Sequence, residues 1–417
     1  MAFAKHKNIV FVLLGCAIVY VLLVLHYYED GLRGDEIRYI SYAKNLINGF
    51  YSPPAPNFNL WSGPGYPLVL VPFVALGFGH FQLVILNVLF LFGSLYFTYK
   101  SVRLFVNDKL ATYITLFQGL YFPISKHIYF VHTECLVWLL VSIICYLLAK
   151  MVLAKKASIG SGMLLSVLLA FLTMVKVVFG YVLIGMTVLL AIRVFCVKRK
   201  VYALRPVGVV SLAFVLCIPW LMYTYSITGR TMLWTNCSSL SLYTMSTSNE
   251  GEYGDWLHPN VLVEHPEHKE FINETMTKTP LEQFDLYQSQ AIKNIKEDKL
   301  GYLKNWVFNI SRMLTEYPTN KRMDVGLAPL KSLIPLLLLL PMLIYFMFVH
   351  LKRRNDVAPE ITMALVFVMA YLFGSSLVSA MERMFFITIP FWMLYVAYFF
   401  RLTSFSLDRI KERLLPK

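Results

Sequence analysis

The sequence predicts an all-α polytopic membrane protein with about ten transmembrane helices, external juxtamembrane helices and one large external loop. Composition is the first indication: 58% of the 417 residues are hydrophobic and only 15% are charged, whereas soluble domains carry about 25% charged residues. The second is a series of apolar runs close to the roughly 20 residues that cross a bilayer. The third is that basic residues, which give a net charge of +14, cluster between those runs, as in cytoplasmic loops. A lipid bilayer is therefore predicted as a partner, and nucleic acid is not.

The apolar runs define the predicted spans in order. They cover residues 8–27, 80–99, 110–127, 134–152, 158–174, 177–195, 206–226, 331–350, 360–380 and 384–400. The first run resembles a signal peptide, but it lacks a small-residue cleavage pattern and further spans follow it, so a retained helix is predicted. The segment from Pro64 to Phe78 is apolar too. Its glycines and prolines predict an eleventh, re-entrant or interfacial segment that does not cross.

The loop charges predict the orientation. Basic clusters follow alternate spans: Lys100 and Arg103, Lys155 and Lys156, Lys198 and Arg199, Lys352, Arg353 and Arg354, and Arg401. All of them fall on one side, which the positive-inside rule assigns to the cytoplasm. Both termini are therefore predicted to be cytoplasmic, with the chain in the cell inner (plasma) membrane. A short span at residues 64–78 is the open alternative, and counting it would reverse every later loop.

Three regions follow from this topology. Residues 1–226 are predicted to form an N-terminal transmembrane catalytic module with a first external loop at 28–79; residues 227–330 form the large external loop, and residues 331–417 hold the C-terminal helices and a cytoplasmic tail. Within the large loop, the apolar period from Pro280 to Tyr317 predicts amphipathic helices beside the membrane. A break between two helices is predicted at Asp298.

Ionisable residues gather on the predicted external side. The acids are Asp35, Glu36, Glu134 and Glu382, and the bases are Arg38, Lys126, Lys176 and Arg383. Charged groups near hydrocarbon tend to be paired and to mark substrate paths. Asp35 or Glu36 is therefore predicted to act as general base on an acceptor hydroxyl. Lys176 and Arg383 are predicted to neutralise a phosphate or diphosphate leaving group.

Structural roles stay open for several of these residues. For Glu382 and Arg383 the alternative is an adjacent surface pair, and for Lys176 it is a side chain that extends to the interface. For Glu134 the alternative is a structural role, in which its negative charge stabilises the start of the fourth span through the helix dipole.

No cofactor is assigned from the residues alone. His127 and His132 lie near Glu134, but their spacing of five differs from the i, i+4 spacing of a helical zinc pair. Ordinary interfacial histidines are the favoured interpretation, so no metal ligand is assigned. A divalent cation such as Mg or Mn held by Asp35 and Glu134 stays open, because carboxylates suit hard cations.

Four short stretches carry a resemblance to a known family. They are Asp35-Glu36 with Tyr39, Ala43, Leu46 and Gly49; Gly63-Pro-Gly-Tyr-Pro67; Ile218-Pro-Trp220 with Tyr225 and Gly229; and Glu382-Arg383 with Pro390. Together they resemble the C-type membrane glycosyltransferases that use polyprenyl-phosphate sugars. The resemblance is to bacterial family 39-like enzymes, related to protein O-mannosyltransferases and aminoarabinose transferase.

The resemblance implies an inverting transfer of a sugar from a polyprenyl-phosphate donor to a glycan, lipid or protein acceptor on the external face. The site residues that it implies are Asp35 as catalytic carboxylate with Glu36 beside it, Glu134 as a second acid and Lys176 near the donor phosphate, with Tyr39, Tyr66 and Glu382 as further candidates. The Lys-Pro-Pro common in the family's proline turn is Ser-Gly-Pro-Gly here, so that lysine is absent.

Two other classes stay open. A lipid-linked glycan flippase or transporter would more often place its charges near mid-membrane. A polysaccharide polymerase or ligase would use arginines of the large loop, for which Arg230, Arg312 and Arg322 are the candidates.

Overall fold

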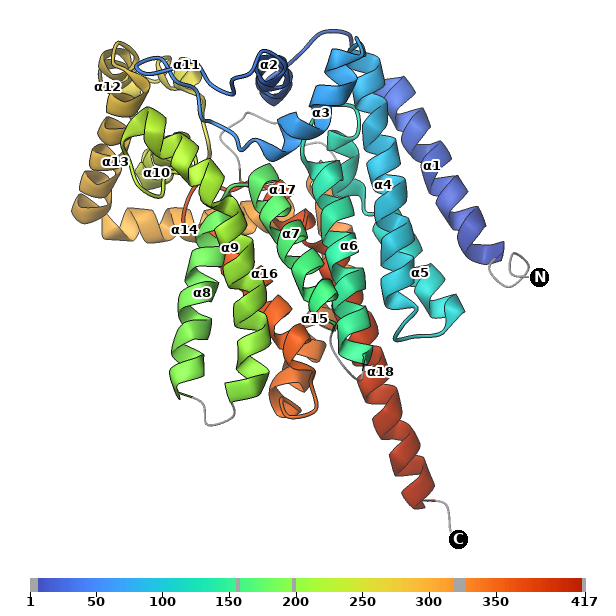
Figure 1. The fold of residues 1–417 in the computed structure, drawn as a ribbon. Helices are drawn as coiled ribbons and strands as arrows, with labels where there is room; N and C mark the ends of the chain where they lie inside the picture. The colour runs from blue at the N-terminus through green and yellow to red at the C-terminus, as the bar shows by residue number, and fades with distance from the viewer. Residues whose placement is uncertain (1–6, 155–157, 197–199, 319–327, 415–417) are drawn as a thin grey trace.

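The computed structural model describes residues 7–154, 158–196, 200–318 and 328–414, and the described chain is all-helical (Figure 1). The longer helices of the bundle, with α5 between them, are α1 (Lys7–Tyr27), α4 (His80–Val102), α5 (Asp108–Gly119), α6 (Glu134–Leu153), α7 (Ile159–Val175), α8 (Val178–Cys196), α9 (Lys200–Thr228), α15 (Ala328–Lys352), α16 (Pro359–Ser376) and α18 (Ile389–Leu414). The remaining helices are α2 (Asp35–Ile47), α3 (Gly65–Ala75), a 3-10 turn (Phe122–His127), α10 (Ser238–Ser246), α11 (Pro259–Leu262), α12 (Pro266–Met276), α13 (Pro280–Glu297), α14 (Lys299–Thr315) and α17 (Arg383–Phe386).

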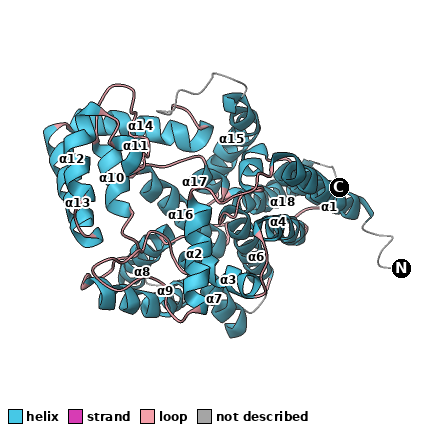
Figure 2. Ribbon diagram, turned by 90° about the horizontal axis from the view of Figure 1, so that it is seen from above, coloured by secondary structure: helices cyan, strands magenta, loops and turns pink. Residues whose placement is uncertain are grey.

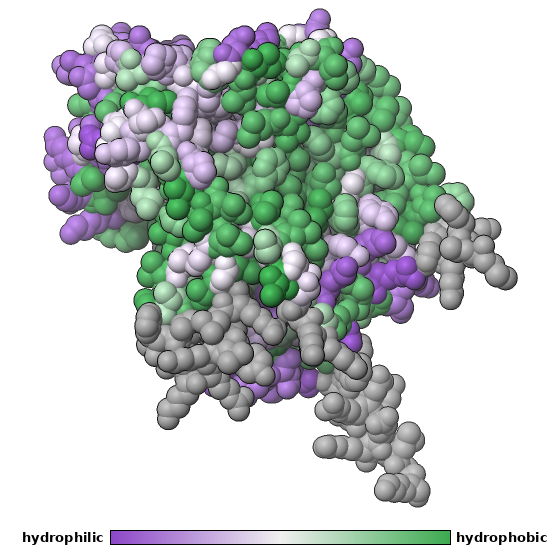
Figure 3. Space-filling view, viewed as in Figure 1, coloured by the Kyte–Doolittle hydropathy of each residue, from purple (hydrophilic) through white to green (hydrophobic). Residues whose placement is uncertain are grey.

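Six of the described helices are long and apolar enough to cross a membrane. Their spanning parts are Asn8–Tyr27, His80–Val102, Glu134–Leu153, Pro206–Thr228, Leu333–Lys352 and Pro359–Ser376. Shorter apolar helices stand among them: Gly65–Ala75, Ile159–Val175, Val178–Ile192 and Ile389–Thr403. Apolar surface covers the middle of the bundle, and hydrophilic surface lies over α11 to α13 (Figure 3). This is the architecture of a polytopic membrane protein, and the total of ten crossings stays a prediction.

The predicted third span, 110–127, is not one continuous helix. Helix α5 has only 12 residues, about 18 Å at 1.5 Å per residue, which falls short of the roughly 30 Å hydrocarbon core. The chain then leaves the helix at Gly119 and forms the 3-10 turn, with Pro123 near its start. Helix α4 descends from His80 and α6 begins again at the upper end at Glu134 (Figure 1). The segment between them therefore still crosses the bundle.

Helix α3 lies at the upper end of the bundle (Figure 1). It has 11 residues, about 17 Å, which is too short to span. This agrees with the prediction that residues 64–78 do not cross.

Polar side chains hold α4, α5 and α6 together inside the bundle. The Ser94 and Ser142 hydroxyl oxygens lie 2.8 Å apart, and Gln118 Nε2 donates to Ser94 Oγ at 3.0 Å. Nearer the upper end, Asn87 Nδ2 donates to the carbonyls of Ile128 at 3.0 Å and Phe130 at 2.6 Å. Such bonds are common between membrane helices. Here they fix the loop that leads into Glu134.

Helices α10 to α14 lie beside the upper end of the bundle (Figure 1) and form a region with its own apolar cluster, which we call the external region after its predicted side. The cluster contains Leu240, Tyr243, Leu257, Leu262, Ile272, Tyr287 and Ala291. Arg312 of α14 is 2% exposed and donates to the carbonyls of Gly254 and Ala380, each at 3.0 Å. This arginine anchors the external region to the segment just before Arg383. The predicted helix break is confirmed, since α13 ends at Glu297 and the Asp298 side chain accepts from Gly301 N at the start of α14.

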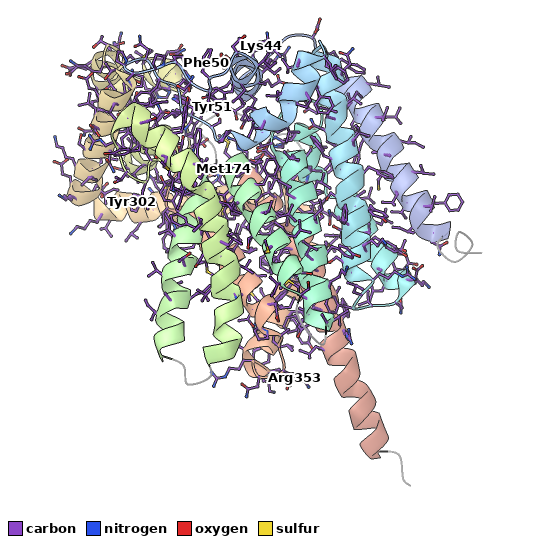
Figure 4. The ribbon with its side chains drawn as sticks, viewed as in Figure 1. Lys44, Phe50, Tyr51, Met174, Tyr302 and Arg353 are labelled. Carbon is purple, nitrogen blue, oxygen red and sulfur yellow. The ribbon has the colours of Figure 1, made fainter. Side chains whose placement is uncertain are left out.

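Several predicted cytoplasmic charges share the opposite end of the bundle. Arg353 and Arg401 line one hollow with Phe105, and Arg353 is at the lower end in Figure 4. The predicted charges Lys155, Lys156, Lys198 and Arg199 lie outside the described residues, as does Arg322. The assignment of this end to the cytoplasm stays a prediction.

Candidate functional site

Helix α2 carries the acidic pair across the upper end of the bundle (Figures 1 and 2). Gly34 precedes it with φ of +53°, a left-handed conformation that favours glycine. The acidic residues of the first turn suit the positive end of the helix dipole. Successive residues of an α-helix are turned by about 100°, so Asp35 and Glu36 face different surroundings.

Asp35 faces a cavity and is held by two arginines. Its carboxylate contacts Arg38 one turn further along α2, and its Oδ2 lies 3.2 Å from Nη1 of Arg383. Burial would raise the pKa of Asp35, but the charges of Arg383 and Arg38 outweigh burial and bring that pKa below its ordinary value of 3.8. Asp35 is therefore an ionised, acceptor-only group at neutral pH.

Arg383, at the start of α17, joins Asp35 to Glu134, whose Oε1 lies 3.8 Å from the same Nη1. Burial lowers the pKa of Arg383, but the carboxylates of Asp35 and Glu134 more than offset this and raise it. The Nε atoms of Arg383 and Arg38 are both buried without a hydrogen-bond partner in the described chain. An unpaired buried donor costs about 1–3 kcal/mol. Both guanidinium groups line the cavity, so their charge suits an anionic group there.

Lys176 lies between α7 and α8 and reaches Glu134, with Nζ 2.7 Å from Oε1. Burial lowers the pKa of Lys176, and the Glu134 carboxylate opposes that effect. Asp35, Lys176 and Arg383 line the cavity, whereas Glu134 does not. Glu134 is 1% exposed and supports the two cations from behind.

Two glycines of the proline turn fix the position of Lys176. A Cβ atom on Gly63 would lie 2.2 Å from the carbonyl oxygen of Met174, and one on Gly65 would lie 2.5 Å from Val175 N. The turn and the end of α7 are therefore in direct backbone contact, which requires glycine. Figure 4 shows Met174 at the upper end of α7, below Tyr51. Tyr51 holds the same turn by donating to the carbonyl of Ser62 at 2.7 Å.

Glu36 points away from the cavity. It is fully buried, and its carboxylate accepts from Val131 N at 2.6 Å and from Arg33 N at 2.9 Å. His80 Nε2 lies 2.9 Å from the same carboxylate. Glu36 does not line the cavity. We interpret it as the residue that ties the start of α2 to α4 and to the loop before α6.

The other three candidate site residues, Tyr39, Tyr66 and Glu382, lie in different surroundings. Tyr39 lines the cavity and packs edge-to-face on Tyr66, with ring centroids 5.1 Å apart. Tyr66 is buried behind it. Glu382 lies 3.9 Å from Lys126 and outside the cavity lining. Glu382 and Arg383, although adjacent in sequence, thus serve different surroundings.

The cavity has a charged end and an apolar end. It encloses about 1760 Å³, part of it open to solvent. The four charged residues of its lining are Asp35, Arg38, Lys176 and Arg383, and its apolar lining on α8 and α16 includes Val182, Met186, Leu189 and Ala370. An apolar pocket with a few convergent polar groups is typical of a ligand site. This one fits an amphipathic ligand with an anionic head.

Sequence reasoning gave no role to three residues of this cavity. Arg38 was predicted only to be one of the bases, and Trp61 had no predicted role. The Arg38 guanidinium carbon lies 4.9 Å from the Trp61 ring centroid. Trp256 reaches the cavity from the external region. It lies in an irregular stretch without periodicity, so no local signal could place it here.

The divalent-cation alternative does not fit this geometry. One nitrogen of Arg383 lies 3.2 Å from Asp35 and 3.8 Å from Glu134, so a guanidinium occupies the space between the two carboxylates. A Mg or Mn ion there would meet like charge. The two histidines do come together: the Nδ1 atoms of His127 and His132 are 3.1 Å apart, and a ligand atom from each lies within 4.8 Å of a Glu134 oxygen. That glutamate is already paired with Lys176.

Comparisons with known proteins add little to this geometry. No protein-family model matches the sequence, and no curated protein matches it. Among solved structures, the chain is similar to the crystal structure of ArnT from Cupriavidus metallidurans bound to undecaprenyl phosphate. The two share 14% sequence identity with a TM-score of 0.40, over 100% of this chain and 82% of that one. A likeness this distant carries no argument about function, which therefore rests on the chemistry of the site.

Proposed function

We propose that this protein is an integral membrane glycosyltransferase. It moves a sugar from a polyprenyl-phosphate donor to a hydroxyl group of a glycan, lipid or protein acceptor, with inversion at the anomeric carbon. The reaction takes place at the membrane face where α2 lies. The observation that carries the proposal is the single cavity in which Asp35, Lys176 and Arg383 meet an apolar groove between α8 and α16.

The cavity offers a partner to each part of such a donor. The guanidinium groups of Arg38 and Arg383, which line the cavity, would donate to phosphate oxygens in charge-assisted hydrogen bonds. Lys176 adds a third cation to the lining. The isoprenoid chain would follow the apolar groove, where dispersion contacts with the protein replace those with lipid tails.

Asp35 supplies the base for the transfer. The acceptor hydroxyl oxygen forms a bond to the anomeric carbon, the bond from that carbon to the phosphate oxygen breaks, and the hydroxyl proton passes to the Asp35 carboxylate. The leaving group is polyprenyl phosphate, whose added negative charge is stabilised by Arg383, Arg38 and Lys176. No general acid is needed, because phosphate leaves as an anion.

Donor binding also prepares the base. In the structure Arg383 is shared between Asp35 and Glu134. A phosphate group would compete with Asp35 for this guanidinium and weaken the interaction that lowers the pKa of Asp35. The carboxylate would then become a stronger base only when the donor is in place.

Purified protein in lipid nanodiscs, incubated with a labelled polyprenyl-phosphate monosaccharide and a membrane extract of acceptors, tests this function. Release of polyprenyl phosphate with transfer of the label is expected. Movement of the intact donor between leaflets of a proteoliposome without bond cleavage would instead show the transporter alternative.

The polymerase or ligase alternative loses one of its candidate arginines. Arg312 is 2% exposed, and its guanidinium donates to the carbonyls of Gly254 and Ala380.

The topology belongs to the same proposal. We propose ten crossings with both termini in the cytoplasm, the catalytic module in residues 1–226, the external loop in 227–330 and the C-terminal helices in 331–417, from which Arg383 completes the site. The alternation of basic clusters supports this arrangement. An inner (plasma) membrane location follows from it.

A further inference from the structure

A second polar cavity lies in the external region, on the far side of α10 from the transfer cavity. Ser238 and Ser241 of α10 line the transfer cavity, whereas Tyr243 and Ser246 line the second one. An α-helix with its side chains is about 10 Å across, so the two cavities are close neighbours. The second cavity encloses about 740 Å³, part of it open to solvent.

A buried hydrogen-bond network makes one wall of this cavity rigid. Tyr243 OH lies 2.8 Å from Nδ1 of His268, and Nε2 of His268 lies 2.6 Å from Glu252. Glu252 also accepts from Thr247 at 2.7 Å and from Asn249 at 3.0 Å. His268 and Asn249 line the cavity. Their orientation is thus set before any ligand arrives, which reduces the entropy lost on binding.

The opposite wall comes from α13 and presents amides. Gln290 Nε2 donates to Asn294 Oδ1 at 2.8 Å, and Asn294 Nδ2 donates to Ser246 Oγ at 3.1 Å. In the described chain these bonds leave Gln290 Oε1 without a partner. Amide groups offer both donors and acceptors, and Phe271 adds an aromatic ring to the lining. This mixture matches the hydroxyl groups and apolar ring faces of a sugar.

The charge of the lining restricts the ligand further. Glu267 and Glu297 are exposed, and together with Asp298 they give the mouth of the cavity three carboxylates. Carboxylates accept hydrogen bonds from hydroxyl and ammonium groups, whereas these three carboxylates would repel an anionic polymer.

We propose that the second cavity binds the acceptor of the transfer reaction, and that this acceptor is a neutral or amine-bearing oligosaccharide. Its terminal hydroxyl would reach Asp35 around α10. Helix α10 is held beside the transfer cavity, because the Ser379 hydroxyl lies 2.8 Å from that of Thr244 on α10 and Ser379 N donates to Ser241 O at 3.2 Å. The role as acceptor site rests on the proposed function, but the binding does not.

Saturation-transfer NMR, which detects the binding of three tetrasaccharides to the full-length protein in nanodiscs, tests this inference. The probes are a neutral N-acetylglucosamine tetramer, its amine-bearing deacetylated counterpart and an anionic galacturonic acid tetramer. We expect the first two to bind and the anionic one not to bind. Equal binding of the anionic tetramer, or no binding by either of the others, would overturn the proposal.

Two variants test whether the tetramers bind in the second cavity. The double change Glu267→Lys with Glu297→Lys lies at exposed positions, so folding is retained, and it should weaken binding of the amine-bearing tetramer at least tenfold. Glu274→Lys, exposed on α12 outside the lining, is the matched control and should leave binding unchanged. Equal binding in the double variant would overturn the proposal.

The Asp35→Asn variant separates the two proposals. It should still bind the neutral tetramer, because the second cavity holds the tetramer and Asp35 would meet only its terminal hydroxyl. Wild-type protein that binds the tetramer without cleaving any donor would refute the transferase and keep this site. Donor cleavage without tetramer binding would refute this site alone.

Discussion

Nη1 of Arg383 lies 3.2 Å from Oδ2 of Asp35, an ion pair between residues 348 positions apart in the sequence. The contact joins α2 to α17, the short helix that precedes the last long helix, α18. It also places the guanidinium of Arg383, which lines the cavity, beside a carboxylate. A carboxylate and a cation are thus adjacent, as the proposed transfer from a phosphate-linked donor requires.

Replacing the guanidinium with an ammonium tests the phosphate contact. Arg383→Lys keeps the charge but loses the Nε–H and the planar fork, so the donor KM should rise about tenfold or more, the equivalent of one charge-assisted hydrogen bond. Steady-state kinetics with a labelled donor measures this. Arg33→Lys is the control, since Arg33 pairs with Glu29 at an exposed position. An unchanged donor KM in Arg383→Lys would contradict the assignment.

The pH dependence of the rate tests the coupling between Asp35 and Arg383. A base must be ionised to act, so activity is lost as the pH falls through its pKa. In the free protein Arg383 and Arg38 outweigh burial and lower the pKa of Asp35, and bound phosphate would relieve that effect. The acid limb of kcat, which reports the complex, should therefore lie at higher pH than the acid limb of kcat/KM, which reports the free enzyme. Coincident limbs would show that the donor does not compete for Arg383.

Glu36 is expected to matter for stability. Glu36→Gln leaves one acceptor oxygen in place of two, so the N–H of Val131 or of Arg33 loses its partner at a cost of about 1–3 kcal/mol. Thermal unfolding in detergent should show a lower midpoint. Glu29→Gln, an exposed change, should leave it within the small range typical of surface substitutions. A Glu36→Gln protein that is fully stable but does not cleave the donor would make Glu36 a catalytic residue instead.

Gly63→Ala tests the backbone contact that positions Lys176. The added methyl would lie 2.2 Å from the Met174 carbonyl oxygen, so the turn or the end of α7 must shift. We expect a loss of about 1–3 kcal/mol in stability and, because Lys176 moves, a reduced rate of donor cleavage. Gly15→Ala is the matched control, since its Cβ would meet nothing within 4 Å. Normal activity in Gly63→Ala would show that Lys176 does not depend on this contact.

The helical, membrane-spanning character of the chain could be predicted because hydropathy is a local property, carried by each apolar run by itself. The third span was the exception. Its apolar composition continues past Gly119, but Pro123 and the polar residues after it favour a 3-10 turn over a longer helix.

The candidate site could be predicted only in part. Residues at span ends of one side were expected to share a face, and Asp35, Lys176 and Arg383 do line one cavity. The different directions of Asp35 and Glu36 depend on how α2 is rotated over the bundle, which the sequence of α2 alone does not determine. The guanidinium of Arg383 lies between Asp35 and Glu134 because residues far apart in the sequence meet in the fold. The sequence alone therefore could not exclude a divalent cation at these two carboxylates. Trp256 required the folded external region.

Donor cleavage by wild-type protein and by Asp35→Asn, compared in the same nanodiscs, tests the central claim most directly. Asparagine keeps the size of the side chain and removes the base, which should lower sugar transfer about 10²–10⁴-fold while the protein stays folded and inserted. The wild type should release polyprenyl phosphate as the label appears on the acceptor. Transfer by Asp35→Asn at a rate near that of the wild type would contradict the account.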